Sequence, residues 1–298
     1  MGVKYRRIDP DYTSLGAYFF NNDIEDIAGN ASWSMFNQSV QISASAGIQK
    51  DNLDNSKSST LTRFIGSGNI NYTKDNFNLG LNYSNYSSDI EFVLDPELDS
   101  LNVVVVTQDL GANASYSIES EGGNQHTFTL ATSVQNVADD IEDPQQSAES
   151  QMFNANFVYV YTLTESGWNF NANTNYNQNQ LAQMEVSRWG IGGGVSKSFL
   201  ENKLNFGFNV NYFKATVETI TNIENSTLNL RLRTNYKISD AIALNLNYSL
   251  MNRRKSDDLG TDESFAEAIG TFGLRYNFAW QPQFKKDSNK QDGSPLNN

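Results

Sequence analysis

The sequence predicts an all-β fold, a single antiparallel up-and-down β-barrel of about fourteen strands. Three observations lead to this prediction. Apolar and polar residues alternate with a period of two along most of the chain. The alternating segments are separated in turn by short connections, rich in Gly, Asn, Asp and Ser, and by longer polar ones. Aromatic residues recur at the ends of the apolar runs.

The connections set the number of strands. The short turns occupy residues 37–38, 74–76, 121–124, 165–167, 201–203 and 239–240. The long connections occupy residues 9–26, 50–59, 89–101, 138–150, 178–186, 219–225 and 254–263. Together they imply fourteen strands, the first at residues 3–8 and the last at residues 265–280.

The two faces of each strand have different chemistry. Leu228, Leu230 and Leu232, for example, alternate with polar residues, and the same pattern holds in residues 77–84, 168–176 and 242–250. The apolar face carries almost no charge, although Lys197 falls on it near a short turn, where its stem can reach the interface. The cations that fall on the polar face, and so line a lumen, are Arg63, Arg231, Arg233, Lys237 and Arg275.

The choice between a membrane barrel and a soluble β-sandwich depends on which face meets the surroundings. Aromatic rings at the ends of the apolar runs suit the two membrane–water interfaces. The polar face consists of Asn, Ser, Gly, Thr and Arg, whereas a soluble sandwich solvates its outer face with long charged chains. An Arg at mid-membrane costs about 2–4 kcal/mol, which explains why these Arg residues keep to the polar face. We therefore predict a transmembrane barrel.

The last predicted strand carries the sharpest motif. Thr271, Gly273, Tyr276 and Phe278 have the spacing polar-x-Gly-x-x-aromatic-x-aromatic. This spacing resembles the assembly signal on the closing strand of bacterial outer-membrane β-barrel proteins. The resemblance implies location in the bacterial outer membrane, with short periplasmic turns and longer extracellular loops. It also implies contact with outer-membrane lipids and lipopolysaccharide, and recognition by the outer-membrane assembly machinery.

We place the barrel in residues 1–280 and a polar, disordered periplasmic tail in residues 281–298. Signals of this kind commonly end the chain at the last aromatic residue, whereas here a tail follows Trp280. Met1 is followed by a strand pattern with no signal peptide. Either a signal peptide has been removed, or Met1 lies inside a longer protein.

Composition excludes several functions. The chain has 21 basic and 34 acidic residues, a net charge of -13, so we expect no binding of nucleic acid. It has no Cys and one histidine, His126, beside a short turn, so we expect no enzyme activity and no cofactor.

The glycines of residues 190–194 have strand pattern on both sides and serve close packing rather than phosphate binding. The acidic loops either gather Ca²⁺ or Mg²⁺ or are solvated surface, and none has calcium-loop spacing, so we predict no metal site.

The function that these patterns favour is a channel for passive passage of small polar or anionic solutes. Fixed positive charges in a lumen bias which ions pass. The same inward cations can instead be structural and simply fill the lumen. Two other functions stay open. One is a non-transporting envelope interaction or scaffold protein, and the other is the C-terminal part of a larger receptor or secretion barrel.

Overall fold

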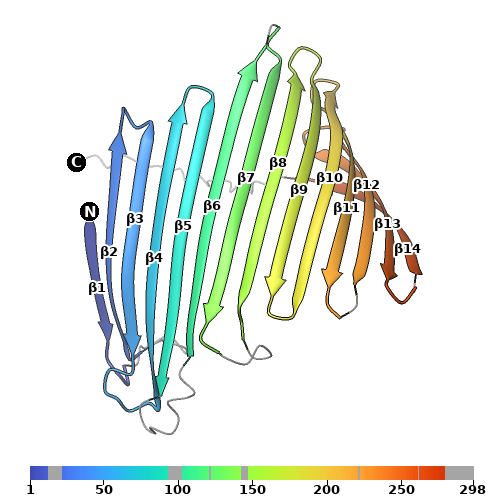
Figure 1. Cartoon of the computed structure of the whole chain (residues 1–298). Helices are drawn as coiled ribbons and strands as arrows, with labels where there is room; N and C mark the ends of the chain where they lie inside the picture. Colours follow the sequence, from blue (N-terminus) through green and yellow to red (C-terminus); the bar gives the residue numbers. More distant parts are fainter. Residues whose placement is uncertain are drawn as a thin grey trace, which may run out of the picture.

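The computed structural model describes residues 1–12, 22–92, 103–120, 122–141, 147–220, 222–260 and 262–278. They form one 14-stranded antiparallel sheet in which every strand pairs with the next along the chain. Among these residues, no helix is long and apolar enough to cross a membrane. Figure 1 labels the strands, which are β1 (Gly2–Ile8), β2 (Ile24–Met35), β3 (Val40–Asp51), β4 (Ser59–Lys74), β5 (Phe77–Phe92), β6 (Val103–Glu119), β7 (Gln125–Asp139), β8 (Ser150–Leu163), β9 (Trp168–Leu181), β10 (Met184–Phe199), β11 (Leu204–Glu218), β12 (Ile223–Lys237), β13 (Ile242–Asp257) and β14 (Asp262–Tyr276).

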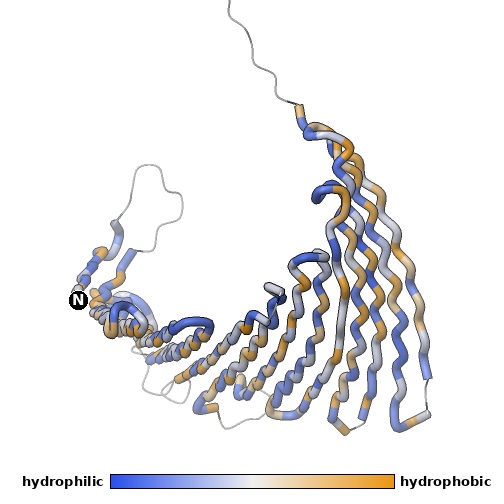
Figure 2. Tube along the Cα trace, turned by 90° about the horizontal axis from the view of Figure 1, so that it is seen from above, coloured by the Kyte–Doolittle hydropathy of each residue, from blue (hydrophilic) through white to orange (hydrophobic). Residues whose placement is uncertain are grey.

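The predicted fold class is confirmed, because the sheet is all-β, antiparallel and up-and-down, with fourteen strands. The sheet curls strongly about an axis along its strands, with β1 and β14 at its two edges (Figure 2). The convex face is turned toward the viewer in Figure 1. The predicted tail, residues 281–298, and the last two residues of the predicted barrel, 279 and 280, lie outside the described residues.

Three of the connections predicted as long are short. Residues 178–186 were expected to form a long loop, but β9 ends at Leu181 and β10 begins at Met184, so the chain turns over two residues. The strand ladder continues through Gln178, Asn179 and Gln180, which are polar on both faces. Polarity on both faces marks the part of a strand that has left the apolar band, and it was mistaken for a loop. The connections 219–222 and 258–261 are also short.

The strand β1 covers only half of its neighbour. Its seven residues pair with Ile24–Asn30 of β2, at the end of the sheet where the longer connections lie. The remainder of β2, residues 31–35, pairs with β3 on one side and has no partner strand on the other among the described residues. The edge of the sheet beside β1 is therefore stepped.

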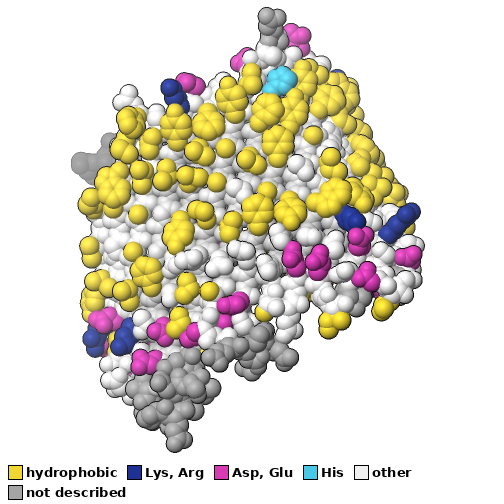
Figure 3. All heavy atoms as spheres, in the orientation of Figure 1, with side chains coloured by type: hydrophobic (Ala, Val, Ile, Leu, Met, Phe, Trp, Pro, Cys, Tyr) yellow, Lys and Arg dark blue, Asp and Glu magenta, His cyan; other side chains and the backbone are white. Residues whose placement is uncertain are grey.

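The apolar residues of this sheet do not form a buried core. Among the described residues, Ala243 is the one apolar residue classed as buried, at 5% exposure. In every strand most of the apolar residues occupy alternate positions, and the pairing register puts them on the same face of the sheet. Leu110, Val134 and Phe153, for example, are neighbours across β6, β7 and β8. Figure 3 shows these side chains as a band over the upper part of the convex face, with polar and charged atoms below it.

The end of the sheet with the longer connections is held by a buried polar network. The side chain of Asn52 is 1% exposed and donates to Thr60 Oγ1 over 3.0 Å, while its Oδ1 accepts from the Lys57 backbone N–H. The Asp23 carboxylate accepts from the Leu53 N–H at 2.7 Å and pairs with Lys57 Nζ at 2.7 Å. Burial of Asp23 opposes its ionisation, but hydrogen bonds from Lys57 and the backbone outweigh burial and hold its pKa below the ordinary value.

Candidate functional site

The concave face of the sheet carries polar side chains whose amides bond across strands. Asn177 Nδ2 donates to Asn154 Oδ1 of β8, and Asn235 Nδ2 donates to Asn245 Oδ1 of β13. The concave face is therefore rich in hydrogen-bond donors and acceptors, although Val158 and Val160 of β8 lie among them. The asparagines at alternate positions of β9 are Asn169, Asn171, Asn173, Asn175, Asn177 and Asn179.

The glycines of β10 make room for these amides. A Cβ added at Gly192 would lie 2.7 Å from Asn173 Oδ1 and would overlap Asn211 Oδ1 from the other side. Gly194 has the same relation to Asn209 Oδ1. Carboxamides from β9 and β11 thus fold over a strip of bare backbone, which supports the interpretation of these glycines as packing residues in the wall.

Four of the five predicted lumen cations come together in one part of the concave face. Arg231 and Arg233 lie about 7 Å apart along β12. Lys237 on β12 and Arg275 on β14 lie in one register row, about 10 Å apart, on either side of Ala243. In the described part of the chain, none of these four forms an ion pair with a carboxylate. We call Arg231, Arg233, Lys237 and Arg275 the cationic wall.

The fifth predicted cation, Arg63, is not part of this wall. It lies on β4, eight strands from β12 along the sheet. Arg63 Nη1 donates to Gln49 Oε1 at 3.1 Å, and its buried Nε has no partner in the described part of the chain. Its register neighbours are Gln49 on β3 and Ser88 on β5, and no other member of the predicted set lies near it.

Further cations of the concave face were missed in the sequence. Arg253 donates through Nη2 to Asn225 Oδ1 at 3.1 Å, and Lys255 Nζ lies 3.8 Å from Glu263 Oε2. Both residues lie at the edge of a predicted loop. They stand at even spacing from Ser249 on β13, and so they point to the same face as Ser249. That continued parity was the signal that could have found them.

A carboxylate also lies on the concave face, away from the cationic wall. Asp109 of β6 accepts from Gln135 Nε2 at 2.7 Å and from Ser84 Oγ at 3.1 Å. These carboxylate contacts come from an amide and a hydroxyl, not from a cation. The concave face therefore carries charges of both signs, with the cationic wall on β12 and β14, and Asp109 on β6 two strands from Arg63 on β4.

The single histidine lies on the convex face, in an aromatic cluster near a short turn. His126 Nδ1 lies 2.8 Å from Tyr159 OH, and its ring stacks on Tyr161 with centroids 4.4 Å apart. Figure 3 shows it at the upper border of the apolar band. Nearby, Lys197 Nζ lies 4.9 Å above the Trp168 ring, as expected for a cation that reaches an interface.

The predicted assembly signal occupies the edge strand β14 and the residues after it. Thr271 and Gly273 lie on the concave side, and Tyr276 lies on the convex side in register with Ile242. Phe278 follows the end of β14, and its ring stacks on that of Tyr276 with centroids 6.1 Å apart. The motif therefore presents its aromatic rings at the free edge of the sheet, close to the short-turn end.

Comparison with known proteins gives structural likeness without sequence likeness. No protein-family model and no curated protein matches the sequence. The chain is similar to the solved structure of CdiB from Acinetobacter baumannii, with 10% identity and a TM-score of 0.32, over 85% of this chain and 56% of that one. It is also similar to the siderophore receptor PirA from Acinetobacter baumannii, with 8% identity and a TM-score of 0.36, over 86% and 64%. For CdiB from Escherichia coli the identity is 9% and the TM-score 0.33, over 93% and 66%. The chain spans less than two thirds of the length of each of these proteins.

Proposed function

We propose that the protein is a bacterial outer-membrane β-barrel that acts as a channel for passive passage of small polar or anionic solutes. The observation that carries the membrane assignment is the inverted distribution of apolar residues. The convex face holds most of the apolar side chains, and the concave face holds the amides and most of the charged wall residues together with a few apolar ones such as Ile65 and Ile269. Among the described residues Ala243 alone is a buried apolar residue.

In water, the exposed apolar side chains of the convex face would be unfavourable, whereas in lipid they would be stabilised. Ile191, Leu130 and Phe272 are 58%, 49% and 71% exposed on the convex face. Removing such a side chain from water contributes about 1.5–3 kcal/mol, so many of them together strongly favour an apolar medium. Within that medium a sheet must also close, because unpaired backbone groups cannot be hydrated there. The proposal therefore requires a closed barrel with its polar face inside.

The cationic wall supports passage of anions. Its four cations have no carboxylate partner in the described residues, so anions of the lumen fluid are the available counter-charges. The amides beside them offer hydrogen bonds to a passing solute in place of its water. The proposal assigns the chain no enzyme activity and no cofactor.

Conductance in a planar bilayer tests the channel. The wild-type barrel should give discrete conductance steps with anion preference, and Arg231→Glu combined with Arg233→Glu should shift the reversal potential toward cation selectivity. Lys197→Gln removes a cation from the convex face and serves as the matched control with unchanged selectivity. Folded barrel without conductance steps would reject the channel in favour of a non-transporting envelope protein. A reversal potential unchanged by the charge reversal would reject the role of the cationic wall.

A second candidate is part of a larger receptor or secretion barrel, in which further strands complete the wall. In lipid, residues 31–35 of β2 would need a partner strand on the side of β1, and among the described residues they have none, so further strands would satisfy them. The protein has no cysteine, so disulfide trapping can be used without background. If β1 closes against β14, Val3→Cys should cross-link to a cysteine placed at one or two positions within Asp262–Tyr276. Absence of a cross-link along all of β14 would favour the larger barrel.

A further inference from the structure

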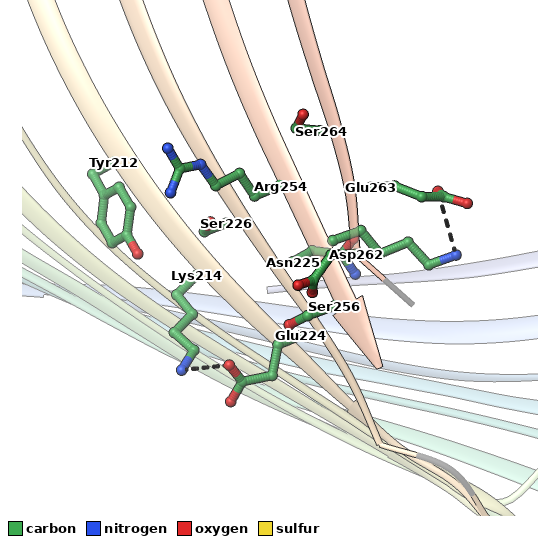
Figure 4. Close-up of a pocket in the computed structure, with 11 residues that line it drawn as sticks. Tyr212, Lys214, Glu224, Asn225, Ser226, Arg254, Ser256, Asp262, Glu263 and Ser264 are labelled. Carbon is green, nitrogen blue, oxygen red and sulfur yellow. Dashed lines mark ion pairs between the residues drawn. The ribbon is translucent and has the colours of Figure 1, made fainter. Parts of the chain in front are cut away.

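A pocket of about 390 Å³ lies at one end of β11–β14, at the same end of the sheet as the longer connections between β1 and β8. Figure 4 shows it, with side chains from all four strands around it. We call it the rim pocket. Its lining residues are Tyr212, Lys214, Glu224, Asn225, Ser226, Arg254, Lys255, Ser256, Asp262, Glu263 and Ser264.

The cations Lys214 and Arg254 of this pocket belong to the convex face. Lys214, Ser226, Arg254 and Ser264 form one register row across β11–β14. They share the parity of Tyr212, which stands two residues from Lys214 and ends the apolar run of β11. These cations therefore sit on the lipid-facing side, immediately beyond the apolar band, and not in the lumen.

The charges in the rim pocket leave one guanidinium available. Lys214 Nζ pairs with Glu224 Oε2 at 2.9 Å, and Lys255 Nζ lies 3.8 Å from Glu263 Oε2. Arg254 forms no ion pair within the described part of the chain and extends toward Tyr212 in Figure 4. Its register neighbours on the two adjoining strands are both serines, so two hydroxyls lie beside it.

The carboxylates restrict where an anion can bind. Asp262 lies in the next register row, farther from the apolar band, in register with Ser256. Glu224 lies in that same farther row and is engaged by Lys214. An anion is therefore favoured on the membrane side of the pocket, at Arg254, and disfavoured on the far side.

We propose that the rim pocket binds the phosphate of a lipid headgroup, and that the lipid is lipopolysaccharide. The inference rests on the outer-membrane placement proposed above, since headgroup phosphates lie just beyond the apolar band. A guanidinium binds phosphate through two parallel hydrogen bonds, and hydroxyls can satisfy the remaining oxygens. The lipid class follows from the side of the membrane: the longer connections mark the outer surface of such a barrel, where lipopolysaccharide is the phosphorylated lipid.

Arg254 and its neighbour Arg253 provide a matched pair of variants. Arg254→Gln removes the proposed phosphate contact on the convex face, while Arg253→Gln removes the same charge one residue away on the concave face. The folded protein is titrated in detergent with diphosphorylated lipid A, and bound lipid is counted by native mass spectrometry. We expect about tenfold weaker binding for Arg254→Gln, the usual effect of losing a charge-assisted contact, and unchanged binding for Arg253→Gln.

The alternative outcomes are distinct. Equal binding by wild type and Arg254→Gln, or equal weakening by Arg253→Gln, would overturn the site. Binding of a glycerophospholipid or of inorganic phosphate as tight as that of lipid A would overturn the choice of lipopolysaccharide. Insertion into lipid vesicles is measured separately for each variant. A wild-type protein that does not insert would reject the membrane assignment itself, whereas insertion with no effect of Arg254→Gln would reject the rim pocket alone.

Discussion

Adding one arginine to either face of β12, in two separate variants, tests which face of the whole sheet meets lipid. Leu232 lies at the middle of the apolar run that extends from Leu228 to Tyr236 on the convex face. The eight residue steps of that run, at about 3.4 Å each and about 40° tilt, span about 21 Å of membrane thickness. The apolar band of a membrane barrel is about 25 Å tall, so Leu232 should lie near the midplane.

Arg in place of Leu232 should therefore lower the free energy of unfolding by about 2–4 kcal/mol. This corresponds to a decrease of roughly 30-fold to 900-fold in the folding equilibrium constant. Asn229→Arg places the same side chain on the concave face of the same strand, beside Asn211 and Met251, and should change stability by about 0.5 kcal/mol or less. Reversible urea unfolding in lipid vesicles measures both variants. Equal destabilisation by the two substitutions would refute the assignment of the convex face to lipid.

Two further predictions concern the ends and the wall of the sheet. The ionised Asp23 carboxylate stabilises the network fully above its unfolded pKa of about 3.9, and this contribution is lost as the pH falls through the lower folded pKa. Hydrogen exchange of the Leu53 amide should accelerate in that acidic range in wild type, and a Lys57→Met variant should show the change at higher pH. In the wall, Gly192→Ala should destabilise by about 1–3 kcal/mol because its Cβ meets two carboxamides, whereas Gly29→Ala, whose Cβ meets nothing within 4 Å, should not. Urea unfolding that ranks Gly29→Ala as the worse substitution would contradict the packing described for β10.

The strands were predictable because their periodicity is strong. In β11, Leu204, Phe206, Phe208 and Val210 alternate with Asn and Gly, and one-residue slippage would move all of them to the wrong face. Short turns were also predictable, because residues such as Asp75 and Gly167 adopt positive φ there. The signal is local in both cases, so one sequence is enough to find it.

The part of the sheet beyond the apolar band was not predictable from the same signal. In β9, Gln178, Asn179 and Gln180 remain in the ladder although both of their faces are polar. Alternation fails there because these residues lie beyond the apolar band, and backbone pairing alone continues the strand. The same effect hid Arg253 and Lys255, and with them part of the concave charge pattern.

Sequence parity placed the five predicted cations on one face of the sheet but could not say which of them are neighbours. Arg63 and Arg231 have the same parity, yet eight strands separate β4 from β12. Neighbourhood across strands depends on register, which is set by the turns and by the pairing of every intervening strand. The proximity of Lys237 and Arg275 across Ala243 is therefore a result of the fold and not of sequence spacing.

The tight turn between β9 and β10 has a practical use. Ala182 and Gln183 connect two strands that stay hydrogen-bonded up to Leu181 and Met184. A peptide epitope inserted between these two residues would stand on a stiff two-stranded stalk instead of on a flexible loop. With the outer-membrane placement proposed above, its height above the bilayer would be set by the sheet, which would make this position suited to displaying a tag on intact cells.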